Sequence, residues 1–76
     1  MIGTIKKLSN FSQSFGIQSE GKIYKLHFQF VYWSQLDPNT IEEDYIGKKV
    51  EFELKPQFSF DGYDGVANCR TLKLVD

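Results

Sequence analysis

The 76-residue sequence predicts an all-β chain that closes into one small five-stranded antiparallel barrel. Two segments alternate apolar and polar residues with the two-residue period of a β-strand. Other short segments, rich in strand-forming residues, follow at regular spacing and are separated by runs that favour turns. No long amphipathic helix interrupts this pattern, and the length leaves room for a single domain over residues 1–76.

The first two strands are expected over residues 2–8 and 14–19. A third is expected over residues 23–30, because every second position in it is apolar: Tyr24, Leu26, Phe28 and Phe30. The Glu20-Gly21 pair lies between the second and third strands, and its glycine can take the positive φ that a tight turn needs. The second and third strands should therefore form a hairpin.

The fourth strand is expected over residues 49–55, where Val50, Phe52 and Leu54 alternate with charged residues. Pro56 lacks a backbone donor and should end it. The fifth strand is expected over residues 66–75, after a turn-rich run.

The connection from the third to the fourth strand is extended, and residues 37–47 can form one or two helical turns within it. Asp37 can cap the first turn, Pro38 suits its first position and Gly47 can end it. This is the one place where a helix is expected.

Composition and charge limit the possible functions. Aromatic residues make up 16% of the chain, enough for a core with rings left over for a surface. The net charge of −1 lacks the strong positive balance of many nucleic-acid-binding proteins. However, four lysines lie in the first third of the chain, so that one face can still be basic: Lys6, Lys7, Lys22 and Lys25.

The single Cys69 cannot form an internal disulfide and has no cluster of metal ligands around it in the sequence. A reducing, cytoplasmic environment is expected. No segment approaches the roughly 20 apolar residues that span a bilayer, so we expect no membrane partner. No nucleophile, base and orienting group stand together and no phosphate-binding glycine loop occurs, so we expect neither an enzyme nor a cofactor.

Five short blocks occur along the chain in one order: Gly3-Thr4-Ile5-Lys6, Phe15-Gly16-Ile17, His27-Phe28, Gly47-Lys48-Lys49-Val50-Glu51-Phe52-Glu53-Leu54 and Ala67-Asn68. In order and approximate spacing they resemble the cold-shock domain over nearly the whole chain. The resemblance implies an OB-fold barrel that binds single-stranded RNA or DNA with little sequence specificity, as an RNA chaperone or a regulator of gene expression. It implies a divergent member of that family.

In the family, two short motifs on neighbouring strands carry rings that stack on bases. At the matching positions of this chain, three stacking side chains remain: Phe15, His27 and Phe28. Three others are replaced, by Lys7, Ile17 and Lys25. This pattern predicts fewer base stacks and more phosphate contacts, with Lys6 beside the first motif. Because Lys25 and His27 alternate with core positions, we expect them to face outward beside Phe15 and Ile17.

Rings in the connections could take the place of the lost stackers. Trp33 follows Tyr32 in the extended loop, Phe58 and Phe60 lie in the connection to the fifth strand, and Phe11 lies close to the position of the first replaced ring. These side chains complete the candidate interface.

Structural roles compete with binding for the same residues. His27 can be an ordinary surface imidazole, Phe15 and Phe28 can be core rings, and the loop rings can cap the ends of the barrel.

The alternative function is a protein-interaction or regulatory module on the same fold, which the replaced stackers and the mild acidity favour. Its anchors would be four loop aromatics, a residue class enriched in interfaces: Tyr32, Trp33, Phe58 and Phe60. A monomer is expected, with a dimer as the alternative state.

Overall fold

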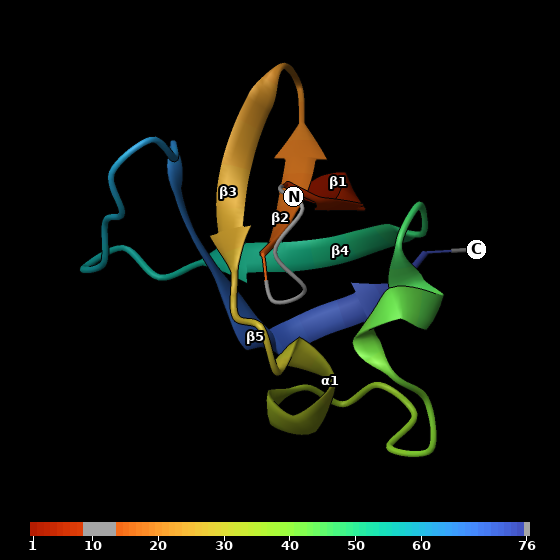
Figure 1. Cartoon of the computed structure of the whole chain (residues 1–76). Helices are drawn as coiled ribbons and strands as arrows, with labels where there is room; N and C mark the ends of the chain where they lie inside the picture. Colours follow the sequence, from red (N-terminus) through yellow and green to blue (C-terminus); the bar gives the residue numbers. More distant parts are fainter. Residues whose placement is uncertain (9–13, 76) are drawn as a thin grey trace.

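In the computed structural model, which describes residues 1–8 and 14–75, five strands form a closed barrel (Figure 1). The strands are β1 (Ile2–Lys7), β2 (Phe15–Ser19), β3 (Lys22–Leu26), β4 (Lys49–Leu54) and β5 (Gly65–Leu74). Their order around the barrel is β1-β2-β3-β5-β4. The predicted all-β, five-stranded barrel is therefore confirmed.

The strand pairing shows how the barrel closes. β2 is flanked by β1 and β3, and β4 by β1 and β5, all in antiparallel ladders. Among the described residues, a short parallel ladder between β3 and β5 joins Tyr24 to Gly65 and Lys25 to Val66, and completes the circle. The predicted β2–β3 hairpin is present, with positive φ at both Glu20 (53°) and Gly21 (78°) of its turn.

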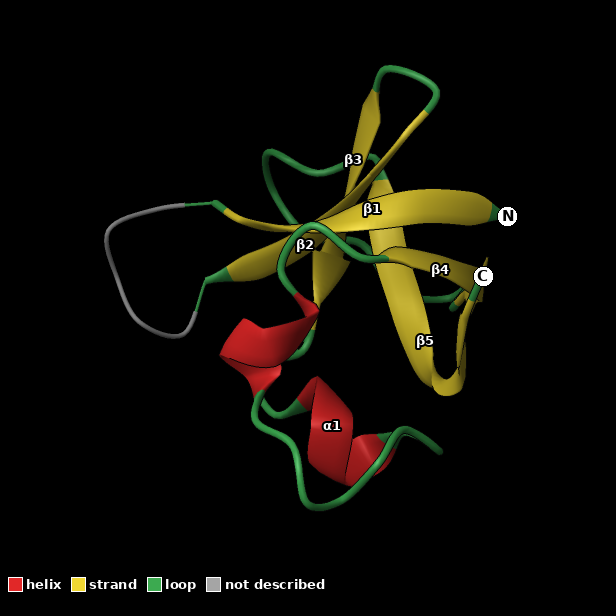
Figure 2. Ribbon diagram, turned by 90° about the vertical axis from the view of Figure 1, so that its right-hand side faces the viewer, coloured by secondary structure: helices red, strands yellow, loops and turns green. Residues whose placement is uncertain are grey.

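Two short helical segments lie in the connection from β3 to β4: α1 (Phe30–Trp33) and the 3-10 turn η1 (Glu42–Tyr45). η1 falls inside the predicted range 37–47, whereas α1 was not expected. Figure 2 shows both at one end of the barrel.

The third strand ends earlier than predicted, at Leu26 instead of residue 30. The alternation of apolar residues continues past this point, but the backbone turns. Phe30 N–H donates to His27 O at 3.1 Å, and Gln29 N–H donates to His27 Nδ1 at 3.0 Å. Phe30 thus reaches the core from a helix and not from a strand.

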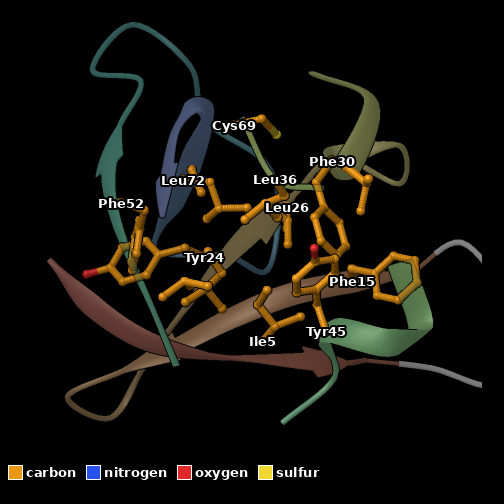
Figure 3. Packing of buried hydrophobic residues seen from close by; sticks show 14 residues of the cluster. Ile5, Phe15, Tyr24, Leu26, Phe30, Leu36, Tyr45, Phe52, Cys69 and Leu72 are labelled. Atoms are coloured by element: carbon orange, nitrogen blue, oxygen red, sulfur yellow. The ribbon is translucent and has the colours of Figure 1, made fainter. Parts of the chain in front are cut away.

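The core is one cluster of buried side chains from all five strands and both helical segments. Figure 3 shows Phe30 of α1 directed toward the rings of Phe15 and Tyr45. It meets both edge-on, with centroids 5.4 Å and 6.1 Å apart. Tyr24 and Phe52 form a second tilted pair at 5.7 Å. The contacts of Phe30 pack α1 against β2 and η1 at the end of the barrel.

None of the helices described here has the length and apolar character that crossing a membrane requires. Within residues 1–8 and 14–75, no three His, Cys, Asp or Glu side chains are grouped so that they could hold a metal ion.

Candidate functional site

A pocket of about 570 Å³ opens where the end of β3, α1, the β4–β5 connection and β5 meet. Figure 1 shows β3 running into α1, and the β4–β5 connection projecting on the left of the view, beside β3. We call it the α1–β5 pocket. Most of the side chains in its walls are aromatic, basic or amide, and a proline and a cysteine complete the lining: His27, Trp33, Lys55, Pro56, Gln57, Phe58, Asn68, Cys69 and Arg70.

A chain of exposed rings runs along the α1 side of the pocket. The imidazole of His27 stacks on Phe28, with centroids 4.8 Å apart and planes 20° from parallel. Trp33 approaches His27 edge-on at 6.3 Å, and Tyr32 approaches Trp33 at 5.0 Å. Trp33 keeps 48% of its surface exposed and Phe28 keeps 40%. In a domain with a complete core, such exposure leaves apolar ring surface available to a ligand.

The β4–β5 connection supplies the remaining aromatic wall. Phe58 is 62% exposed, and the ammonium of Lys55 lies 5.3 Å from its ring centroid. This cation–π contact keeps a positive charge beside an exposed ring. A base stacked on Phe58 and a phosphate near Lys55 could therefore be bound together.

A second group of residues, the Lys25 cluster, consists of Lys25, Phe60 and Tyr63. The Lys25 ammonium lies 5.4 Å from the Phe60 centroid and 5.5 Å from that of Tyr63, and the two rings meet edge-on at 5.7 Å. Asp64 holds this end of the loop to β3. Its backbone N–H donates to Ile23 O and its carboxylate accepts the Ile23 N–H, both at 2.8 Å. The cluster thus has a defined position.

The charged side chains that line the α1–β5 pocket are cations, Lys55 and Arg70, and none of the described residues lining it is a carboxylate. Burial raises the pKa of the Cys69 thiol above its ordinary value. A hydrogen bond with the backbone of His27 and the positive charge of Lys55 lower this pKa, but by less than burial raises it. Cys69 is therefore a neutral thiol near pH 7. The pocket has a positive electrostatic character on a chain with a net charge of −1.

The hydrogen bond from Gln29 N–H to His27 Nδ1 assigns the tautomer of the imidazole. Because Nδ1 accepts, the ring proton is on Nε2. His27 lines the pocket and is exposed, so Nε2–H is a donor that a ligand can use.

Two residues predicted to lie in the binding site, on the outer face of the sheet, lie in the core instead. Phe15 and Ile17 are buried in the core, with 1% and 0% of their surfaces exposed, and neither can stack a base. In the β2–β3 ladder Phe15 pairs with Leu26 and Ile17 with Tyr24, and directly paired residues face the same side of a sheet. The expectation that they lie beside Lys25 on the outer face is wrong.

Gly16 occupies the outward position opposite Lys25, and Lys6 of β1 pairs with Gly16. A Cβ at Gly16 would lie 2.5 Å from Cδ1 of Leu8, so Leu8 covers this glycine closely. The outer face of β1–β2–β3 at this level therefore presents lysines and an aliphatic side chain in place of rings.

The other predicted residues have separate outcomes. Lys6 and Lys7 are exposed on β1, and Lys25 is half-buried. His27, Trp33 and Phe58 meet in the α1–β5 pocket, Phe28 stacks on His27, and Phe60 joins the Lys25 cluster. Phe11 lies outside the described residues.

Four polar residues of the pocket were not predicted: Lys55, Gln57, Asn68 and Arg70. Asn68 belongs to one of the quoted blocks, which was a usable signal. Arg70 carried no local signal, because its proximity to α1 depends on how the barrel closes.

Comparison of the chain with models of protein families, with curated proteins and with solved structures finds no match. The resemblance to the cold-shock domain therefore stays a prediction.

Proposed function

We propose that this chain binds single-stranded RNA or DNA, with little sequence demand overall, through the α1–β5 pocket and the neighbouring Lys25 cluster. The observation that carries the proposal is the combination of exposed rings and cations in the pocket, without a carboxylate among the described residues that line it.

Unpaired bases present flat π faces, and each base stacked on an aromatic side chain contributes on the order of 1–3 kcal/mol. The exposed rings of Trp33, Phe58 and Phe60 offer such faces in the part of the chain that the structure describes. Two or three stacks, together with phosphate contacts, suffice for binding at micromolar concentrations.

With a net charge of −1, the molecule as a whole does not attract a polyanion. Electrostatic binding of a nucleic acid therefore depends on where individual cations lie. Lys25, Lys55 and Arg70 lie next to the rings or in the pocket. If these three cations neutralise three phosphates, log K should fall with log salt with a slope of about −2, at about −0.7 per phosphate of a single strand.

Fluorescence anisotropy with labelled oligo-U and oligo-dT, recorded across a salt series, tests the proposal. We expect saturable binding at micromolar protein in low salt and the shallow slope given above. Trp33→Ala should weaken binding by about 5- to 150-fold, the factor that corresponds to one lost base stack.

Ile41→Ala is a suitable control, because Ile41 is also apolar and 58% exposed but does not line the pocket. It should leave binding unchanged. Flat anisotropy traces at micromolar protein in low salt would refute single-strand binding. Such traces together with a concentration-dependent sedimentation shift would instead select the protein-interaction module, in which the same rings contact a protein.

A further inference from the structure

The dimensions of the α1–β5 pocket suit one nucleotide. Its volume of about 570 Å³ lies within the range of about 300–1,000 Å³ typical of pockets for single small ligands. Rings from separate segments enter it: His27 follows β3, Trp33 ends α1, and Phe58 lies beyond β4. A base that leaves the path of a bound strand could be held there, whereas a run of several stacked bases needs a longer surface.

The polar side chains that line the pocket are mainly hydrogen-bond donors. Asn68 Oδ1 accepts the backbone N–H of Arg70 at 3.2 Å, which leaves the two N–H bonds of the Asn68 amide for a ligand. His27 presents Nε2–H, since its Nδ1 already accepts from Gln29. The side chains of Lys55 and Arg70 can only donate. The described side chains that line the pocket include one other amide oxygen that can accept a hydrogen bond, that of Gln57.

Bases differ in the group they present to such donors. Guanine O6 and the O4 of uracil or thymine are acceptors, whereas adenine and cytosine carry amino donors at the corresponding positions. When a bound base covers these exposed and half-buried donors, an amino group placed against them leaves both sides without a hydrogen-bond partner, and this costs binding free energy. Resting on the proposed function, we infer that the α1–β5 pocket holds one base of the bound strand and selects the keto bases, guanine and uracil or thymine, over adenine and cytosine.

Titration of the full ¹⁵N-labelled chain with GMP, AMP, UMP and CMP tests this selection without an oligonucleotide. The signals to follow are the side-chain amide of Asn68, the backbone amides of residues 68–70 and the indole of Trp33. GMP should bind about three- to tenfold more tightly than AMP, and UMP than CMP by the same factor, which corresponds to one hydrogen bond. Each comparison keeps the ring size constant, so differences in stacking do not determine the result.

Asn68→Asp keeps the acceptor for Arg70 N–H and replaces the free amide donors by a carboxylate oxygen, which accepts from amino groups. We expect this variant to abolish or reverse the preference of UMP over CMP. Asn39→Asp is the matched control, because it makes the same amide-to-carboxylate change at an exposed residue that does not line the pocket. It should keep the order of the four nucleotides.

The outcomes separate the two proposals. If the chain binds oligonucleotides but the NMR signal of the Asn68 side-chain amide does not shift, or if the four nucleotides bind with equal affinity, the proposal of a base-selective pocket is wrong. The proposal of single-strand binding then remains. If the mononucleotides bind in the expected order but oligonucleotides do not bind, the proposed function is wrong. The proposed selectivity of the pocket for keto bases then remains. If Asn68→Asp does not fold, the order of the four nucleotides on the unaltered chain still decides.

Discussion

Replacing Phe30 by alanine tests whether the short helix α1 is an integral part of the core. Phe30 is fully buried and packs edge-on against Phe15 and Tyr45. Removing a buried phenylalanine costs about 3–5 kcal/mol, from lost burial and from the cavity that remains. A 76-residue domain has a free energy of unfolding of about 4–11 kcal/mol, so Phe30→Ala should remove much or all of it.

The matched control lies two residues further along the same helix. Tyr32 is 77% exposed, so Tyr32→Ala should change the free energy of unfolding by no more than about 0.5 kcal/mol. Urea unfolding followed by circular dichroism measures both variants, and Phe30→Leu, expected to cost about 1.5 kcal/mol or less, provides a folded comparison. Equal midpoints for Phe30→Ala and Tyr32→Ala would refute the packing of α1 described here, and with it the position of Trp33 at the pocket.

Three other variants or measurements test the turn, the barrel and the buried thiol. Glu20 has a positive φ in the hairpin turn, so Glu20→Asn should stabilise the fold by about 0.5–1 kcal/mol in urea unfolding; an unchanged or lower midpoint would contradict the left-handed turn. A Cβ on Gly3 would lie 2.5 Å from Ile17 Cγ2 and 2.6 Å from Gln18 O, so Gly3→Ala should destabilise by about 1–3 kcal/mol, and a neutral effect would argue against this β1–β2 spacing. Burial raises the pKa of the Cys69 thiol, so less thiolate is present at pH 8 than in the unfolded chain. Alkylation by iodoacetamide should therefore be slow in the native state, accelerate as the pH rises and become fast in urea, whereas equal native and unfolded rates would show that Cys69 is accessible.

The strand pattern could be predicted wherever one face of a strand is buried and the other is wet. In β4, Val50 and Phe52 are buried whereas Glu51 and Glu53 are exposed, as their alternation indicated. The hairpin followed from a glycine in a two-residue turn. Both signals are local, because burial on one side and the backbone conformation of a turn leave their mark on neighbouring residues.

The prediction of the interface was wrong where it depended on which residues of β2 pair with which residues of β3. Lys25 and His27 were correctly expected to face away from the core. Phe15 and Ile17 were placed with them, but the ladder pairs these two residues with Leu26 and Tyr24. A shift of one residue moves every side chain of a strand to the opposite face, and the glycine between two apolar residues gave no indication of which face was buried.

The sequence by itself determined the fold class, the turn of the hairpin and the supply of rings and lysines, since these depend on residue type and on spacing within one segment. Only the tertiary structure decided which of these side chains meet. Trp33 and Arg70 are 37 positions apart in the sequence, and they line the same pocket because α1 packs on the barrel through Phe30 and because β5 closes the barrel against β3. Contacts of this kind arise from the closure of the whole sheet, which no local pattern records.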